Sequence, residues 1–180
     1  MLITILQAIF FCAVSLPEAR NWCINAHGKQ PYGDRAYSFH LDAVREVLER
    51  FKVANFYNRY AAYGHDVLED TRKRLFDMLL AGFPWRAVLL CWLVTDHAGA
   101  TREQRKARTY PFIALWQEAI ILKLADRIAN VEMGEKLAMY RHEYPHFRAA
   151  LYNPRHRRAR ELWAHLDCLM GWTTSVAISG

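Results

Sequence analysis

Helical periodicity is present in almost every informative segment of this chain. Apolar residues recur three and four positions apart, and no run of alternating apolar and polar residues persists. We expect a loop over residues 28–37 and a charged connection, helical in part, over residues 96–110. Helices are predicted over residues 17–27, 38–51, 72–82, 85–94 and 116–133, in the segment around His65, and before and after Pro145 and Pro154. The predicted class is all-α.

The length of 180 residues predicts one domain with a single core. There is no repeat, low-complexity tract or interdomain linker, and 53% apolar with 23% charged residues is typical of a globular protein. We place the domain at residues 17–170, after an apolar helical segment at residues 1–16 and before a frayed tail at residues 171–180.

The N-terminal segment needs an interpretation of its own. Residues 1–14 are nearly all apolar, but no Lys or Arg precedes the apolar run, and it is too short to span a bilayer. Thr4 with Gln7 forms a capping-box pattern. Ser15 with Glu18 forms another, so two short helices are predicted. We expect a packed or oligomer-forming helix; export or membrane contact is the alternative.

Charge and cysteine spacing bear on partners and compartment. A formal charge of +6 and a pI near 9.3 favour an anionic partner, whether nucleic acid, nucleotide or membrane surface. The four cysteines include no CxxC pair and no zinc-ribbon spacing, which indicates reduced, mostly buried thiols in a cytoplasmic protein.

Residues 64–71 read Gly-His-Asp-Val-Leu-Glu-Asp-Thr and concentrate cation-binding groups. On a helix, His65 lies one turn before Glu69, and Asp66 lies one turn before Asp70. Four groups able to hold or polarise a cation would then share one patch. A merely solvated acidic patch would not need the histidine.

Two more ligand-type residues lie on predicted buried faces. His40 shares the apolar side of its helix and, taken alone, would be a core histidine. Asp126 lies in a helix that is apolar nearly all round, where it would by itself form an ion pair with Lys123 or Arg127. Taken together, however, three helices each turn a ligand-type residue inward. Two imidazoles and two carboxylates suit a divalent metal such as Mn²⁺, Fe²⁺ or Zn²⁺, with positions open for water and a phosphate oxygen.

The order His40, His65-Asp66, Asp126 resembles the H…HD…D signature of the HD phosphohydrolase superfamily. More narrowly, the chain resembles the hydrolase domain of RelA/SpoT homologues and the stand-alone small alarmone hydrolases. An isolated HD dipeptide is weak evidence for this family, whereas HD-x-x-ED-T combined with KLADR-x-x-N is a specific signature of it. The segments that carry the resemblance follow the family's order between about residues 20 and 132: 26–30, 31–40, 65–71, 94–96 and 123–130.

The resemblance implies an HD-type helical bundle that binds one Mn²⁺, or another divalent metal, through His40, His65, Asp66 and Asp126. Enzymes of this kind remove the 3′-diphosphate from guanosine tetra- or pentaphosphate and give pyrophosphate with GDP or GTP. By the same resemblance, Glu69 and Asp70 match the acidic pair that orients or activates water. Asn130 matches an asparagine that contacts the nucleotide.

The chain departs from the family at the nucleoside clamp. The family often carries a basic pair shortly before the first metal histidine, and here Pro31 and Tyr32 take that place. Lys29 and Arg35 remain as candidates for substrate binding, and the base specificity stays open. The remaining residues are too few for a synthetase domain, so alarmone synthesis is not expected.

Two arginine-rich stretches have competing interpretations. In residues 101–110, Arg102 and Arg105 are candidates for binding substrate phosphates, and the alternative is a solvated basic loop. The second stretch is expected to be a solvated helix face and consists of Arg155, Arg157, Arg158 and Arg160.

The sequence thus predicts a cytoplasmic metal-dependent phosphohydrolase with a polyphosphorylated nucleotide as substrate. We expect no obligatory nucleic acid and no firm membrane association, and homo-oligomerisation is left open. One alternative keeps the metal site and changes the substrate to a dNTP, NADPH or a cyclic nucleotide. The other alternative is a basic nucleic-acid-binding module, which strongly salt-dependent binding of oligonucleotides would favour.

Overall fold

The structure, a computed structural model, describes residues 13–96, 98–134 and 136–172, and all structural statements refer to these residues. Helices dominate, and the predicted all-α single-domain bundle is confirmed. The helices are α2 (Leu16–His27), α3 (Ser38–Arg50), α4 (Phe56–Gly64), α5 (Val67–Asp70), α6 (Leu75–Leu80), α7 (Trp85–Val94), α8 (Arg102–Ala114), α9 (Gln117–Glu132), α10 (Leu137–Leu151), the 3₁₀ helix η1 (Arg157–Ala159) and α11 (Arg160–Met170).

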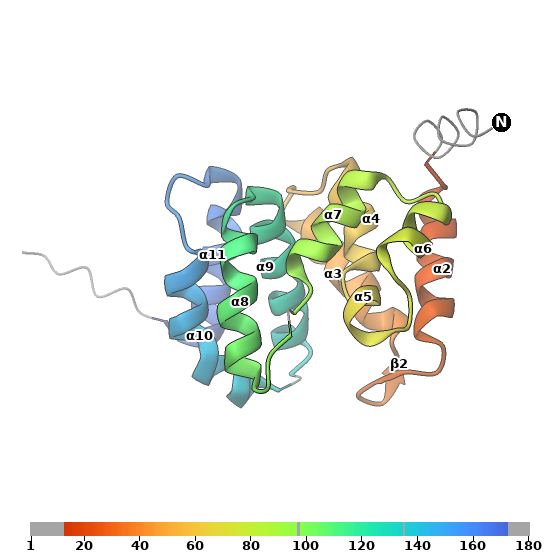
Figure 1. The fold of residues 1–180 in the computed structure, drawn as a ribbon. Helices are drawn as coiled ribbons and strands as arrows, with labels where there is room; N and C mark the ends of the chain where they lie inside the picture. Colours follow the sequence, from red (N-terminus) through yellow and green to blue (C-terminus); the bar gives the residue numbers. More distant parts are fainter. Residues whose placement is uncertain (1–12, 97, 135, 173–180) are drawn as a thin grey trace, which may run out of the picture.

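Helix α9 lies at the centre of the bundle. It packs against α3, α4 and α7 on one side and against α8, α10 and α11 on the other (Figure 1). Helices α2 and α6 lie at one end of the molecule, and α11 lies at the other. Most of α9 is buried, as expected for a helix that is apolar nearly all round.

The core is built mainly from aliphatic side chains on the contact faces of α3, α4, α7 and α9. Leu41 and Val44 of α3 and Ile121 and Leu124 of α9 have no exposed surface. Burying each such side chain contributes roughly 1.5–3 kcal/mol. Because α3 and α9 pack along their length, polar residues on their facing sides are carried into the interior.

The second predicted capping box is confirmed at the start of α2. Ser15 Oγ accepts a hydrogen bond from the Glu18 N–H, and Glu18 Oε2 accepts one from the Ser15 N–H. The Thr4–Gln7 pattern lies outside the described residues. Among the described residues, no helix has both the length and the apolar character needed to cross a membrane.

The predicted loop over residues 28–37 contains a small antiparallel hairpin, so the expectation of loop alone was wrong. Strands β1 (Pro31–Tyr32) and β2 (Arg35–Ala36) pair, with Pro31 opposite Ala36. Gly33 occupies the turn with φ +59°, a conformation that glycine adopts without steric cost. Two-residue strands are too short to show alternation in the sequence.

The continuous helix predicted through the His65–Asp70 segment is broken. Helix α4 ends at Gly64, and α5 begins only at Val67. His65 Nδ1 lies 2.9 Å from the Ala62 carbonyl oxygen, which an uninterrupted helix would use for a backbone bond. The Asp70 N–H still donates to the Asp66 carbonyl at 2.8 Å, so Asp66 and Asp70 remain on the same side of this helical turn.

Two further predicted boundaries differ, and a third prediction, a charged connection that is helical in part, is confirmed. Helix α10 runs through Pro145, contrary to the expectation of separate helices, because Tyr144 and Phe147 are buried in the core and hold the turn around the exposed proline. Most of residues 96–110 belong to α8, which Thr101 caps by accepting from the Gln104 N–H. Helix α6 is shorter than the predicted span of residues 72–82.

Candidate metal centre

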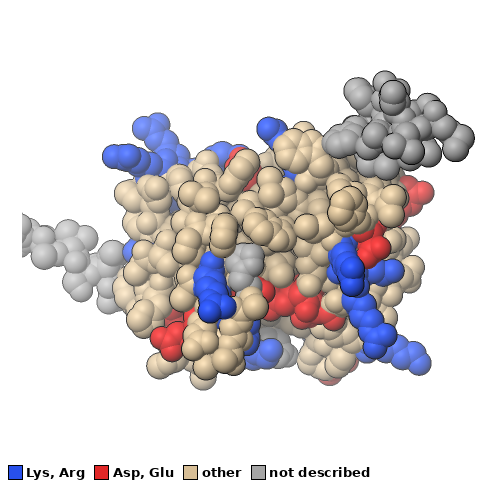
Figure 2. All heavy atoms as spheres, in the orientation of Figure 1, with Lys and Arg blue, Asp and Glu red and all other residues tan. Residues whose placement is uncertain are grey.

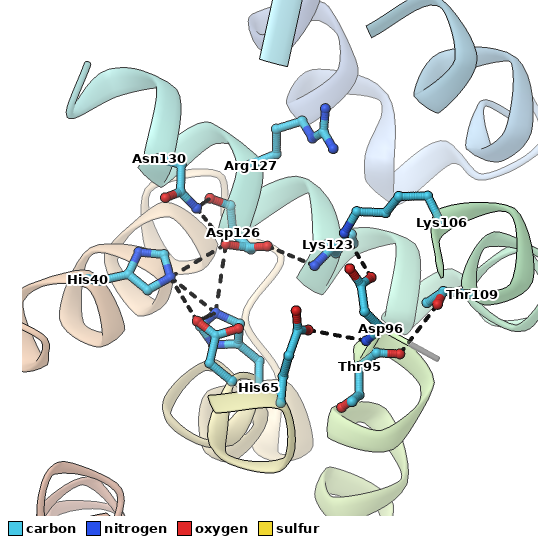
Figure 3. Close-up of polar contacts among 12 residues, drawn as sticks. His40, His65, Thr95, Asp96, Lys106, Thr109, Lys123, Asp126, Arg127 and Asn130 are labelled. Carbon is cyan, nitrogen blue, oxygen red and sulfur yellow. Dashed lines mark hydrogen bonds and ion pairs between the residues drawn. The ribbon is translucent and has the colours of Figure 1, made fainter. Parts of the chain in front are cut away.

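Four side chains from three parts of the bundle converge on one point. His40 comes from α3, His65 and Asp66 from the turn after α4, and Asp126 from α9. Figure 3 shows His40, His65 and Asp126 pointing toward one another. The two Nε2 atoms are 3.2 Å apart. His40 Nε2 lies 3.3 Å from Asp66 Oδ2 and 3.4 Å from Asp126 Oδ1.

The spacing of these donor atoms suits a small divalent ion. His65 Nε2 lies 3.0 Å from Asp66 Oδ2 and 3.7 Å from Asp126 Oδ1. An octahedral ion with bonds of about 2.1 Å places adjacent donor atoms about 3.0 Å apart. His40 Nε2, His65 Nε2 and Asp126 Oδ1 lie close enough together to hold one ion, and Asp66 Oδ2 lies within 3.3 Å of both histidine nitrogens, so Asp66 is placed to serve as a fourth donor.

Neighbouring groups fix the orientation of the ligands. The bond between His65 Nδ1 and the Ala62 carbonyl leaves Nε2 facing the cluster. Asn130 Nδ2 donates to Asp126 Oδ1 at 2.7 Å. The Tyr37 hydroxyl donates to Asp66 Oδ2 at 2.5 Å. Such second contacts are typical of metal ligands, whose geometry they hold in place.

The electrostatics of the cluster stabilise positive charge at its centre. Burial alone would lower the pKa of His65, but the Asp66 and Asp126 carboxylates raise it to about 10. Burial alone would raise the pKa of Asp66, yet His65 and His40 hold it well below its ordinary value. Burial would likewise raise the pKa of Asp126, but Lys123 and the two histidines hold it well below its ordinary value. The carboxylates are therefore ionised and face a cation, whether a protonated imidazole or a bound metal.

Glu69 and Asp70, the acidic pair, lie beside the cluster, and their carboxylates have different hydrogen-bond partners. Asp70 Oδ2 accepts a hydrogen bond from Gln30 Nε2 at 2.7 Å and lies 3.0 Å from the Tyr37 hydroxyl, whose single hydrogen it shares with Asp66. Glu69 Oε2 accepts one from the backbone N–H of Asp96 at 3.1 Å. Burial raises the pKa of Glu69. Glu69 is therefore the candidate proton acceptor of the pair.

A cavity of about 290 Å³ opens onto the donor cluster and the acidic pair. In Figure 2, acidic side chains gather near the middle of the face in view, with Lys and Arg side chains on either side. The cavity also contains a set of cationic side chains from α8, α9 and the turn before α10. These are Arg102, Lys106, Lys123, Arg127 and Lys136.

The cations that line the cavity are themselves positioned by acids. Lys123 Nζ lies 3.0 Å from Asp126 Oδ2, so the predicted internal pair exists alongside the donor cluster. Lys106 Nζ lies 2.8 Å from Asp96 Oδ1 (Figure 3). Burial, with Lys123 nearby, lowers the pKa of Lys106 to about 8. Both lysines are fixed in place and can present N–H donors to an anion.

The sequence left two possible ion-pair partners for Asp126, Lys123 and Arg127. Arg127 does not pair with Asp126. Figure 3 shows its side chain pointing away from the cluster. The guanidinium lies 4.0 Å from the centre of the Phe147 ring and 4.7 Å from that of Tyr140. It also contacts Glu143 at 3.4 Å. Arg127 therefore joins α9 to α10 at the edge of the cavity.

The predicted substrate-binding residues divide into two groups. Arg102 lines the cavity, where it forms an ion pair with Glu143, and Asn130 lines it while it holds Asp126. Lys29, Arg35 and Arg105 do not line the cavity. Lys29 is exposed, the Arg35 guanidinium stacks 4.1 Å from the Phe39 ring, and Arg105 Nη1 donates to the Gly99 carbonyl.

Several cavity residues were not predicted from the sequence. Tyr37 has the clearest signal, because it stands three residues before His40 and so falls on the same side of the chain. Tyr32 stacks on His40 with ring centres 4.8 Å apart and donates to Asn130 Oδ1. Lys106 was hidden in a charged run, where no spacing rule separates it from solvated neighbours.

The second arginine-rich stretch lies far from the cavity. Arg155, Arg157, Arg158 and Arg160 are exposed around η1 and the start of α11, as predicted for a solvated face. Cys23 and Cys91 are buried, and Cys168 is exposed. These residues do not contribute to the cavity.

Comparisons of the chain with protein-family profiles, with curated proteins and with solved structures found no match.

Proposed function

We propose that the chain is a metal-dependent phosphohydrolase that removes the 3′-diphosphate of guanosine tetra- or pentaphosphate and releases pyrophosphate with GDP or GTP. One observation carries the proposal. His40, His65, Asp66 and Asp126 converge from three parts of the bundle, and His40, Asp66 and Asp126 line a cavity that also holds two acids and five cations.

The donor set fits a hard or borderline divalent cation such as Mn²⁺, because two imidazole nitrogens and two carboxylates offer no thiolate and leave open positions. When bound, such an ion would polarise a phosphoryl oxygen and lower the pKa of a bound water. The ligands would be the two Nε2 atoms, Asp66 Oδ2 and Asp126 Oδ1, whose convergence supports the assignment.

The protein's own residues divide the remaining work. Water adds to the phosphorus attached to O3′, the O3′–P bond breaks, and O3′ takes up the proton that Glu69 removes from the water. Glu69, with its pKa raised by burial, accepts the proton of the water. Asp70 is held by Gln30 and Tyr37 and orients the water. Lys106 and Arg102 stabilise the charge of the diphosphate.

The test is to incubate the full chain with Mn²⁺ and a nucleotide panel and to identify the products by chromatography. We expect pyrophosphate and GDP from guanosine tetraphosphate, and no product after chelation or from Asp126→Asn. We also expect the guanine and adenine alarmones to differ in rate by less than about tenfold, or 1.4 kcal/mol. If guanosine tetraphosphate survives unchanged while the metal is bound, the proposed substrate is wrong.

A second candidate keeps the metal site and changes the nucleotide. It is favoured by the position of Lys29 and Arg35 outside the cavity, since no nucleoside clamp of the expected kind lines the site. The inorganic product separates the two candidates. A dNTP hydrolase releases tripolyphosphate, a phosphatase releases orthophosphate, and the proposed alarmone hydrolase releases pyrophosphate.

A further inference from the structure

Helix α6 exposes two large apolar side chains on its outer face. Phe76 is 76% exposed and Leu80 is 71% exposed, while Met78 on the opposite face is fully buried. Phe76 and Leu80 stand four residues apart and so lie one above the other. Single exposed apolar residues are common, but two on one helix face next to a chain of cations form a defined surface.

The cations come directly before this helix. Arg72, Lys73 and Arg74 are consecutive and exposed. Within the described part of the chain, no acid lies within 4 Å of their charged groups. Lys and Arg side chains stand out at the right of Figure 2, over the α5–α6 region of Figure 1. This face therefore combines exposed apolar side chains with three cations that form no ion pair among the residues that the structure describes, and the acids Glu18 and Asp77 lie beside them.

The chain enters the described fold on the same face. Val14 N–H donates to the Gly82 carbonyl at 2.9 Å, just after α6, and the Val14 carbonyl accepts from the Tyr60 hydroxyl. An open depression of about 440 Å³ is shared by Val14, Lys73 and Leu80. Glu18 and Asp77 also border it, and each of these acids accepts hydrogen bonds from a helix-capping backbone N–H.

The segment that leads into Val14 is apolar and carries no charged side chain. Residues 1–12 read Met-Leu-Ile-Thr-Ile-Leu-Gln-Ala-Ile-Phe-Phe-Cys. An uncharged apolar segment that joins the fold beside exposed Phe and Leu side chains and three cations matches the chemistry of an anionic lipid surface.

We propose that the outer face of α6, formed by Arg72, Lys73, Arg74, Phe76 and Leu80, docks reversibly on an anionic membrane surface. The cations would contact lipid headgroups, and the two apolar side chains would enter the boundary between headgroups and acyl chains. A symmetric dimer through this face would bring two sets of three cations together, with Glu18 and Asp77 of each copy beside them, and sedimentation velocity distinguishes it from vesicle binding. An acidic protein partner would neutralise the cations but would leave the apolar segment at residues 1–12 unaccounted for.

The experiment is cosedimentation of the full chain with vesicles of phosphatidylcholine, with and without about one third phosphatidylserine. We expect binding only to the anionic vesicles and weaker binding as salt is raised. The triple variant Arg72→Gln, Lys73→Gln, Arg74→Gln should lower the apparent affinity about tenfold or more. The double variant Phe76→Ser, Leu80→Ser should weaken it by a similar factor at unchanged charge.

A matched control removes three cations from the other end of the molecule: Arg155→Gln, Arg157→Gln, Arg160→Gln. This variant should bind the vesicles like the wild type, and circular dichroism should show that every variant is folded. Equal loss of binding in the control would mean that net charge alone drives association, which overturns the proposal. The proposal is also overturned if the wild type does not bind vesicles and sedimentation velocity instead shows a dimer that Phe76→Ser dissociates.

Discussion

Glu69 and Asp70 are neighbours in the chain, yet their surroundings give them different chemistry. The carboxylate of Asp70 is held by Gln30 and Tyr37, whereas the donor that contacts Glu69 is the backbone amide of Asp96. Burial raises the pKa of Glu69 toward the range in which a base works best at neutral pH. The two acids therefore suit two roles, a proton acceptor and a positioning group.

Glu69→Gln should lower kcat by about a hundredfold or more while the protein keeps its metal, because the amide cannot accept a proton. In the wild type, kcat/KM should fall as the pH falls through the pKa of Glu69, since the protonated acid is inactive. Burial raises that pKa, so the acid limb should lie above the ordinary glutamate value of about 4.3. The measurements are pH–rate profiles and metal analysis of the purified protein.

The matched control is Glu46→Gln, which makes the same change at an exposed position on α3 and should leave kcat unchanged. Two outcomes would contradict the assigned role. Metal lost from Glu69→Gln would make Glu69 a ligand, and wild-type turnover in that variant would remove it from the reaction.

At the scale of helices, the site depends on how closely α4 meets its neighbours. Gly64 ends α4 directly before His65. A Cβ at this position would lie 2.7 Å from Met78 Cε and 3.0 Å from Cys91 Sγ. The absence of a side chain thus lets α4 approach α6 and α7, and this approach sets the position of the turn that carries His65 and Asp66.

Gly64→Ala should therefore destabilise the protein by about 1 kcal/mol, the lower end of the usual cost of inserting a methyl group into a packed core, because Met78 Cε ends a flexible side chain and can shift, whereas Cys91 Sγ has less freedom. The measurement is the free energy of unfolding from urea denaturation. Combined with Met78→Ala, which removes the nearest atom, the substitution should cost less than the sum of the two single changes. Additive costs would show that the clash with Met78 is not the cause.

At the scale of the whole molecule, the donor cluster ties together three parts of the bundle. Helix α3 supplies His40, the turn after α4 supplies His65 and Asp66, and α9 supplies Asp126. A site that binds a metal ion through all of these side chains exists only when the three parts of the bundle are assembled. Metal binding should therefore be coupled to the stability of the complete fold.

Mn²⁺ at about a hundred times its Kd should stabilise the native state by about 2.7 kcal/mol. For a chain of 180 residues, this corresponds to a rise in Tm of roughly 5–10 °C. The measurement is calorimetry with and without Mn²⁺, with Asp126→Asn as the variant that should lose the shift. An equal rise in Asp126→Asn would place the ion elsewhere on the protein.

Local patterns in the chain were enough to predict the helical class, the start of α2 and most helix positions, because periodicity and capping depend on neighbouring residues. They also predicted the set of four ligand-type residues, since buried polar groups stand out in helices that are otherwise apolar. Whether His40 and Asp126 were core residues or part of a donor cluster depended on whether their side chains come into contact in the fold. That is a contact across 86 residues of chain, which no local pattern encodes.

The way in which these elements fit together depended on packing between segments that are far apart in the chain. The helix breaks at His65, since the imidazole competes for the Ala62 carbonyl, and α10 continues through Pro145, since Tyr144 and Phe147 are buried on both sides. Packing also separated the arginines and lysines that line the cavity from those that do not. Charge and spacing are alike in the two groups, and packing alone determines which side chain faces the cavity.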